Sequence, residues 1–413
     1  MKNSTNLSST NAIVSELLLK RANELLEFML SNPPFLEVVA RFANLFMELE
    51  RVIFLRNSDP ASDNKANGYY ERNLACSLGN LNLKVPRDRL GDFRPFMLPP
   101  PYKRATDDME DVLLNLVLSS YSPNKMKSFL NSLNLPYSKE EVEEIKEEIL
   151  KEAKGINTRG IKENYLAVYI DAYHTPIKEK VDEKIMEGVI YVIVGITLEG
   201  EKEMLGYYIN IGNENKGDWL SVLNQLIDRG LKRPLMIVSD DFPGLIEAIR
   251  VLFPNTDHQL CTVHLKRNIY RNISKAESKE FLLELKKIML EGDYDIALSK
   301  FDELCGKYER KYPQFMKMLK EKKKHYFAYI KYPMEIRRYL NNTNTVESVN
   351  SILETIRRTS GGHFQSIDTA MVSIYVITKK LKNNKWSKGI PAIKSSRYEI
   401  MQMFNSRFQT QKS

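Results

Sequence analysis

The sequence predicts an α/β protein in which helices surround a mixed β-sheet, joined to a mainly helical amino-terminal region. Two short apolar runs, 165–170 and 234–239, are the main evidence, because each has the length and the aliphatic, β-branched composition of a buried strand. An acid closes each run, Asp171 in the first and Asp240 in the second. Acids at the carboxyl ends of buried strands lie at the rim of a sheet, where a ligand can reach them.

Length and composition indicate a soluble globular protein with several structural units. The chain has 413 residues, of which 43% are hydrophobic and 28% charged. At roughly 150 residues per domain this suggests two to four units with a sizeable core. The formal net charge of +8 favours a nucleic-acid partner. Charge that serves only solubility explains the same balance equally well, and an acidic membrane surface is a further alternative.

Cysteine usage and hydropathy predict a cytoplasmic location, at the nucleoid when DNA is bound. The three cysteines, Cys76, Cys261 and Cys305, are too few and too scattered for a disulfide framework. No apolar segment with a cleavage site follows the first residues. The longest apolar stretch, 189–196, is far shorter than the roughly 20 residues that span a bilayer, so no membrane partner is predicted.

The amino-terminal third is predicted to bind DNA. Residues 1–55 have the apolar spacing of two amphipathic helices, separated at Asn32-Pro33-Pro34, and are candidates for oligomerisation or DNA binding. A polar linker is expected over 56–68. Residues 69–158 then begin with a small hairpin over 69–89 and continue in short helices. These helices suit a helix-turn-helix DNA reader, and a plain helical bundle fits the pattern as well.

The remaining chain has the element order of a ribonuclease-H-like core. Three successive strands are followed by a helix, a strand, a helix, a short strand and a late helix that carries an acid. The expected strands are 166–171, 188–197, 203–211, 235–240 and one near 258–264, with helices at 217–229 and 244–253. The predicted parts are the first part of the core (159–265), an all-α insertion (266–340), and the second part with the carboxyl-terminal tail (341–413).

Asp171 and Asp240 are the first candidates for a metal site. Hard divalent cations prefer carboxylate oxygens, and two cations about 3.5–4 Å apart can hold the attacking and leaving oxygens of a phosphodiester. Asp241 competes with Asp240 for the second position. Asp240 is preferred because it directly follows the apolar run, which leaves Asp241 to cap the next helix.

The third acid is expected on a helix that starts near Asn344. Glu347 lies in its first turn, beside the apolar stripe that faces the core. The spacing of Asn344 and Glu347 also fits a helix cap with a supporting glutamate, so the pattern alone does not decide the role of Glu347. Glu354 and Asp368 remain alternatives.

Cys261-Thr-Val-His264 has the spacing of half a zinc site. Five histidines and three cysteines supply no second pair, so zinc is not predicted. His264 is expected to contact DNA or to support the acids, and Cys261 to pack as a small hydrophobic residue. Basic residues cluster at 266–271, at 320–329 and at Arg357-Arg358. Such clusters are either solvated helix faces or phosphate contacts.

An ordered set of short motifs runs from about residue 68 to Trp386. It comprises Gly68-Tyr69 with Arg72, the run 85–93, Tyr169-Ile-Asp-Ala172, Val238-Ser-Asp240, Gly244-Leu245, Phe253-Pro254, the run 259–264, Arg267-Asn268, the run 343–347 with Asn350, and Arg357-Arg358. With this set the chain resembles the mutator-type transposases of bacterial and archaeal insertion sequences, in the DDE superfamily. It departs from the usual pattern at Asp241, at Gly361-Gly-His363 and at Cys76, none of which is an expected metal ligand.

The resemblance implies a site and a cofactor. Asp171, Asp240 and Glu347 fall on the catalytic acids, which would hold two Mg²⁺ ions, with Mn²⁺ as a substitute. Cys261 and His264 fall on the family's Cys-x-x-His element. Further DNA-binding or supporting residues are expected among the basic side chains, namely Arg87, Arg89, Lys266, Arg267, Arg357 and Arg358.

The resemblance also implies an activity, DNA transposition. Such an enzyme binds the terminal inverted repeats of its element, hydrolyses a phosphodiester at each end, and directs the freed 3′-hydroxyl against target DNA. At least a homodimer is expected on DNA, because two ends must be brought together. Two alternatives remain open: a ribonuclease-H-like nuclease or resolvase that only hydrolyses, and a DNA-binding regulator derived from an inactive transposase.

Overall fold

The computed structural model describes residues 19–58, 63–76, 78–99, 139–178, 184–359 and 361–408, together with a few single residues between 106 and 131. The chain forms two compact units, Met1–Lys146 and Glu147–Ser413. Of the short helices expected in the later part of the 69–158 region, the stretch 107–138 falls almost entirely outside the described residues, and the structure describes only α5 (Lys139–Gly155). Among the helices described, none has the length and apolar content needed to cross a membrane.

The amino-terminal unit contains two helices and a hairpin. Residues 19–30 are helical, and α2 (Phe35–Asn57) follows the expected break, where Asn32 has a φ of 51°. Strands β1 (Ala66–Cys76) and β2 (Gly79–Asp88) pair antiparallel, so β1 begins inside the segment expected to be a linker. A small core joins α2 to the hairpin and contains Ala43, Met47, Leu74, Leu81, Leu83, Val85 and Leu98.

Arg51 of α2 fixes the hairpin to the helix. This side chain is buried, and its guanidinium Nη1 donates to the backbone carbonyls of Gly68 and Arg87, at 2.9 and 3.1 Å. The guanidinium also lies over the Tyr69 ring, 4.8 Å from its centroid. A buried arginine needs such partners, because an unpaired charge away from water is costly.

The second unit is built on a five-stranded mixed sheet in the order β5-β4-β3-β6-β7. β3 pairs antiparallel with β4, and β4 antiparallel with β5, whereas β3 with β6 and β6 with β7 are parallel. The bounds are β3 (Asn164–Lys178), β4 (Ile185–Ile196), β5 (Lys202–Ile211), β6 (Arg233–Ser239) and β7 (Asp257–Leu260). The predicted mixed α/β class is therefore confirmed.

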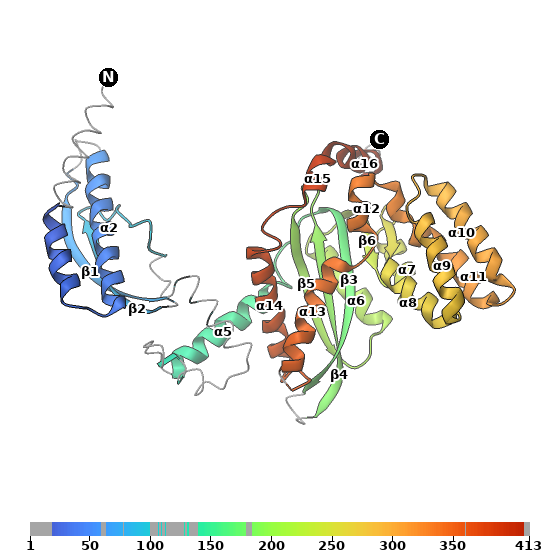
Figure 1. Cartoon of the computed structure of the whole chain (residues 1–413), viewed down its shortest axis with the longest axis horizontal. Helices are drawn as coiled ribbons and strands as arrows, with labels where there is room; N and C mark the ends of the chain where they lie inside the picture. The colour runs from blue at the N-terminus through green and yellow to red at the C-terminus, as the bar shows by residue number, and fades with distance from the viewer. Residues whose placement is uncertain are drawn as a thin grey trace, which may run out of the picture. The chain divides into compact units, whose positions relative to one another are not determined.

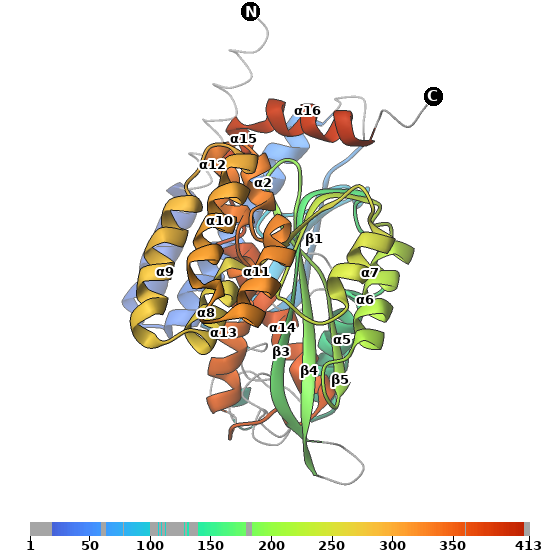
Figure 2. The ribbon, with the colours of Figure 1, turned by 90° about the vertical axis from the view of Figure 1, so that its right-hand side faces the viewer.

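Helices cover both faces of this sheet (Figures 1 and 2). On one face, α6 (Lys216–Asp228) and α7 (Leu245–Leu252) enclose a core that includes Val168, Ile170 and Trp219. On the other face lie α13 (Asn344–Thr359) and α14 (Ile367–Asn383). Alternate side chains of a strand point to opposite faces, so Tyr169, Asp171 and Tyr173 face α13 while their neighbours enter the α6 and α7 core.

Between β7 and α13 the chain is helical. The elements are α8 (Thr262–Asn272), α9 (Lys275–Ile288), α10 (Tyr294–Glu309), α11 (Pro313–Tyr326), η1 (Ala328–Lys331) and α12 (Met334–Leu340). Gln259 of β7 anchors this block, because its amide nitrogen donates to the Tyr326 carbonyl at 3.0 Å and its amide oxygen accepts from the Tyr329 amide at 2.9 Å. The remaining elements are α5 (Lys139–Gly155), α15 (Pro391–Ser395) and α16 (Arg397–Phe408).

Asp171 does not close its strand, contrary to the prediction. β3 continues to Lys178, because residues after Asp171 remain paired with β4 as a long antiparallel ribbon. Pairing between β3 and β6 ends earlier, at Tyr169 with Val238. Asp171 therefore lies beside the carboxyl end of β6, at the rim that β6 makes, although its own strand runs on.

Candidate active site

Asp171 is a buried carboxyl group on the face of the sheet that α13 covers. Only 6% of the residue is exposed, and its Oδ2 accepts a hydrogen bond of 2.7 Å from the Asn350 side-chain amide. Burial, followed by the neighbouring Asp240 carboxylate, raises the pKa of Asp171 to about 8, while His264 acts in the opposite direction. A carboxyl group this perturbed by burial and by a like charge is typical of a functional site.

Asp240 is the second acid of this rim and directly follows β6, as predicted. Its Oδ1 is buried and has no hydrogen-bond partner among the described residues. Burial, then the Glu214 carboxylate, raises the pKa of Asp240 to about 6.

Asp241 is used differently from the prediction. Lys322 of α11 lies 2.7 Å from both of its carboxylate oxygens. The cap of α7 is Gly244, in a left-handed conformation, so Asp241 caps no helix. A lysine from the helical block thus pairs with Asp241, whereas no lysine or arginine in the described part of the chain forms an ion pair with Asp240.

Glu347 reaches the same region from α13. The apolar stripe of this helix, Val346, Val349 and Leu353, is fully buried and fixes which face meets the sheet. Glu347 stands beside that stripe, and its Oε1 is buried without a hydrogen-bond partner among the described residues. The helix begins at Asn344, so Asn344 occupies the first helical position instead of the capping position.

Glu354 and Asp368, the alternatives to Glu347, each pair with other residues. Glu354 accepts hydrogen bonds from Tyr173 at 2.5 Å, from Arg357 at 2.6 and 2.9 Å, and from Arg358 at 2.7 Å. These donors, Arg357 first, hold the pKa of Glu354 well below its usual range. Asp368 lies 3.3 Å from the Lys154 ammonium.

The Cys261-Thr-Val-His264 element connects the end of β6, next to Asp240, with the start of α13, which carries Glu347. The Cys261 amide donates to the Ser239 carbonyl at 2.7 Å, and the Thr262 amide to the Asn341 carbonyl at 3.0 Å. Thr343 donates its hydroxyl to the Cys261 sulfur at 3.3 Å. Cys261 is therefore buried where β6 ends and α13 begins, which is a positioning role beyond simple packing.

His264, one turn into α8, borders the acids. It counteracts the raised pKa values of both Asp171 and Asp240. Its Nδ1 is buried without a partner among the described residues, and its Nε2 lies 3.2 Å from the Arg267 guanidinium. These contacts place the histidine between the acids and an exposed arginine.

The structure places the basic candidates in different settings. Lys266, Arg267 and Arg358 are exposed on their helices, and Arg357 is half-buried, with both Arg357 and Arg358 paired to Glu354. Arg87 and Arg89 belong to the amino-terminal unit, where Arg89 pairs with Asp63 at 2.8 Å. Within the lysine-rich stretch of α11, Lys320, Lys322 and Lys323 each pair with an acid. Their contacts with DNA stay a prediction.

Two groups near the acids were missed from the sequence. Asn350 was noted within a motif without a role, although it lies three residues after Glu347 and therefore on the same helix face. Glu214, which precedes α6, accepts hydrogen bonds from Trp219 at 2.7 Å and from His174 at 3.0 Å. Its only sequence signal was an acid between a strand and a helix, which is common in turns.

The chemistry of these side chains fits a hard divalent cation. As they stand, no three or more His, Cys, Asp or Glu side chains in the described part of the chain form a ready-made metal cluster. Neighbouring carboxylates repel one another unless a cation or a proton lies between them. Burial, together with this repulsion, is why the pKa values of Asp171 and Asp240 are raised. Buried oxygens without partners on Asp240 and Glu347 supply the donor atoms that Mg²⁺ prefers.

Several known proteins are similar to this chain over most of its length. Similar proteins include the transposase for insertion sequence element ISRM3 of Rhizobium meliloti, 26% identical over 365 residues, covering 87% of this chain and 89% of the relative. The transposase for IS256 in transposon Tn4001 of Staphylococcus aureus is 28% identical over 334 residues, covering 79% and 84%. That for IS905 of Lactococcus lactis is 27% identical over 290 residues, covering 70% and 73%. These relatives are transposases of insertion sequences.

The family model for "Transposase, Mutator family" matches residues 36–389, so the chain belongs to the Mutator family of transposases. The match includes every acid discussed above. It begins within α2 and therefore covers the hairpin of the amino-terminal unit as well as the sheet of the second unit. Membership implies an enzyme that cleaves DNA and transfers strands.

Proposed function

We propose that this protein binds the terminal inverted repeats of an insertion sequence and catalyses Mg²⁺-dependent cleavage and strand transfer through Asp171, Asp240 and Glu347. One observation carries the proposal: Asp240 at the end of β6 and Glu347 on α13 both raise the pKa of the buried Asp171 on β3, and the pKa of Asp240 is raised as well. Buried carboxyl groups with no structural ion pair are expensive to keep, which favours a catalytic purpose.

We propose that the second unit is a ribonuclease-H-like core, and its strand order supports this. Its sheet combines three antiparallel strands with two parallel ones in the order β5-β4-β3-β6-β7, and its late helix α13 lies against β3. The helices α8–α12, which lie between β7 and α13 in the chain, support the proposal of an all-α insertion there. We propose that the core supplies the catalytic acids and that the helical insertion binds DNA.

The proposed reaction needs little covalent work from the protein. Divalent cations held by Asp171, Asp240 and Glu347 would neutralise phosphate charge and lower the pKa of the attacking oxygen. Asn350 orients the Asp171 carboxylate through its amide, so that one oxygen of Asp171 stays free of that bond. His264 and the exposed Lys266 and Arg267 continue from the acids along α8, where they can contact the phosphates of a DNA strand.

An element-end assay tests this function. Purified protein is mixed with a duplex oligonucleotide that ends in the inverted repeat flanking this reading frame, together with a plasmid target and Mg²⁺. We expect nicked ends and products in which the oligonucleotide is joined to the plasmid. Nicked ends without joining would identify a nuclease, and binding without any cleavage would identify a regulator; either outcome overturns the proposal.

We expect the raised pKa values of Asp171 and Asp240 to make the stability of the protein depend on pH. The folded-state pKa values of Asp171 (about 8) and Asp240 (about 6) lie above the ordinary value of 3.8. The folded protein therefore binds protons that the unfolded chain has lost, and the free energy of unfolding decreases as pH rises from about 4 to 8. In EDTA, the melting temperature should be lower at pH 8.5 than at pH 6.

Mg²⁺ should reverse this loss, because cation binding needs ionised carboxylates and releases protons. Thermal unfolding with and without Mg²⁺ should show a stabilisation that is larger at pH 8.5 than at pH 6. In Asp171→Asn both effects should shrink. Equal Mg²⁺ stabilisation of the wild type and Asp171→Asn would contradict the assignment of the metal ligands.

A further inference from the structure

Helix α2 has three sides, and other described elements of its unit cover two of them. Ala43 and Met47 are buried in the core that α2 shares with the hairpin. Glu48 faces the helix 19–30, because its Oε1 lies 3.3 Å from the guanidinium Nη2 of Arg21. At about 100° per residue, these two sides leave a third side that makes up roughly a third of the helix circumference.

The third side of α2 carries a continuous apolar stripe, called here the α2 stripe. Its members follow one another at alternating steps of four and three residues, which is the heptad spacing of a coiled-coil seam. The exposed members are Phe35, Phe42, Phe46 and Ile53, and the partly buried members are Val39 and Leu49. A seam of this kind is completed by another helix.

The helix 19–30 extends this apolar face. It runs antiparallel to α2, because the pair described above joins its start to Glu48, whereas Phe28 near its end lies 5.4 Å from the guanidinium of Arg41, two turns earlier in α2. Counted from these contacts at about 100° per residue, the exposed Leu26 and Met29 turn to the same side as the α2 stripe. The two helices therefore share one open apolar face.

The composition and area of this face favour a protein partner over DNA. The α2 stripe contains no lysine or arginine, whereas binding to phosphates needs cations. Aromatic side chains have about 150–250 Å² of surface, so at 40–66% exposure the six exposed side chains of the face offer roughly 600 Å². Two such faces would bury about 1,200 Å², which is enough for a specific interface.

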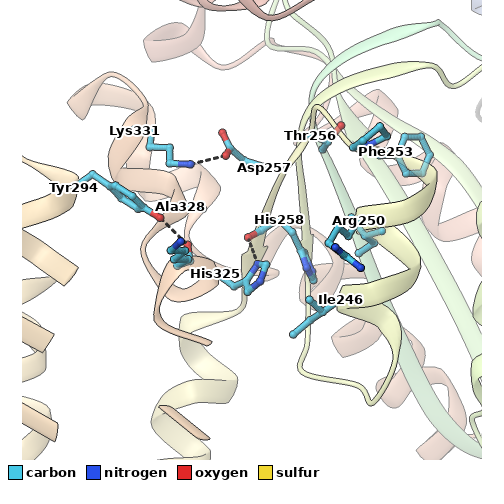
Figure 3. A pocket seen from close by; sticks show the side chains of 13 residues that line it. Ile246, Arg250, Phe253, Thr256, Asp257, His258, Tyr294, His325, Ala328 and Lys331 are labelled. Carbon is cyan, nitrogen blue, oxygen red and sulfur yellow. Dashed lines mark hydrogen bonds and ion pairs between the residues drawn. The ribbon is translucent and has the colours of Figure 1, made fainter. Parts of the chain in front are cut away.

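The second unit presents no comparable face among its described residues. Its exposed large apolar side chains are scattered, with at most two on any one strand or helix. The pocket between α7 and the end of α11 is lined in part by Arg250, Asp257 and Lys331, and the last two form an ion pair at 2.8 Å (Figure 3). It is therefore not a continuous apolar surface. Within the described chain, the surface that matches the α2 stripe is the same stripe on a second copy.

We propose that the face formed by α2 and the helix 19–30 is the interface of a homodimer that forms without DNA, with the α2 stripe of each copy packed against that of its partner. The steps of the stripe read four-three-four-three-four in both directions, so two identical helices can interlock under two-fold symmetry. The hairpin lies on another side of α2 and stays clear of the interface. Such a dimer would hold two element ends, and this last consequence alone rests on the proposed function.

Sedimentation velocity of the full chain, in EDTA and without DNA, tests the proposal. We expect a dimer at micromolar concentration. Phe46→Glu should raise the dissociation constant of the dimer by about 100-fold or more, because it places like charges opposite each other in the seam. Phe96→Glu is the matched control, since Phe96 belongs to the same unit, is 95% exposed and lies in a turn. It should leave the dissociation constant unchanged, and both variants should keep the melting temperature of the wild type.

Cross-linking with a short bismaleimide locates the interface. The three native cysteines are buried, so the reagent reports cysteines that are introduced at the surface. Phe42→Cys and Phe46→Cys are treated separately and as a mixture. In a parallel dimer each position meets itself, and in an antiparallel dimer the two positions meet each other, so one of these samples should give a covalent dimer. Phe96→Cys should give none.

A wild type that stays monomeric at every concentration would overturn the proposal, because the α2 stripe would then be covered within its own chain, by residues 1–18 or by the second unit. A dimer that Phe46→Glu and Phe96→Glu weaken equally would overturn it as well. The samples contain neither DNA nor a divalent cation. Failure here would therefore leave the element-end assay, and with it the transposase function, unaffected.

Discussion

Asp171→Asn should abolish both nicking and joining of an element-end oligonucleotide while DNA binding survives. Asp171 is the acid that feels both of the others, since the charges of Asp240 and Glu347 each raise its pKa. Asparagine keeps the shape and can still pair with Asn350, but it removes the charge that a cation needs. Loss of one preorganised electrostatic contact commonly costs about 10²–10³-fold in rate, and loss of a metal ligand should cost at least that.

Product gels and an electrophoretic binding assay on the same preparation measure this prediction. Asp228→Asn, the same change at an exposed carboxylate near the end of α6, serves as the control and should retain wild-type rates. Residual joining by pure Asp171→Asn within tenfold of the wild type would refute the role of Asp171. Loss of binding together with activity would indicate a folding defect, which a thermal unfolding curve distinguishes.

Glu347→Gln and Glu354→Gln should fail in different ways, although both residues lie on α13. Glu347 has a buried oxygen with no hydrogen-bond partner among the described residues, so the glutamine variant should fold normally and lose activity by about 10²-fold or more. Glu354 is bound by Tyr173, Arg357 and Arg358. Its amide should therefore lower the melting temperature, because the arginines lose a charged acceptor.

Activity per folded molecule separates the two cases. Rates are measured at a temperature where each variant is fully folded, as judged by circular dichroism. Glu354→Gln should then retain activity within about tenfold of the wild type, and Glu347→Gln should not. The reverse pattern would transfer the role of the third acid to Glu354.

Much of the fold could be predicted because strong local patterns specify it. The runs 165–170 and 234–239 became neighbouring strands β3 and β6, and the helical spacing after Asn344 became α13. The end of β3 could not be predicted, since Ala172–Lys178 is paired with β4 through a long-range register that no local pattern contains. Strand length in a ribbon depends on the partner as much as on the sequence itself.

The acids of the candidate site could be proposed from the sequence, but the contacts around them could not. Adjacent Asp240 and Asp241 are equivalent in a sequence pattern, and only the approach of Lys322 from α11 distinguishes them. In the same way, the bond between Thr343 and Cys261 joins residues that are far apart in the chain. Roles that depend on tertiary contacts between distant segments leave no periodic trace in the sequence.

The helical block leaves and re-enters the core at almost one point, because Thr262 bonds to Asn341 and Cys261 to Thr343. A long excursion whose two ends touch adds little closure entropy when it lengthens, since that cost grows only with the logarithm of length. Evolution could therefore enlarge or trim the block at its far end, in α9 and α10, without disturbing the acids. Shortening α11 would be different, because Lys322 and the Tyr326 carbonyl fasten that helix to the core. We therefore expect length variation among relatives to concentrate between α9 and α10.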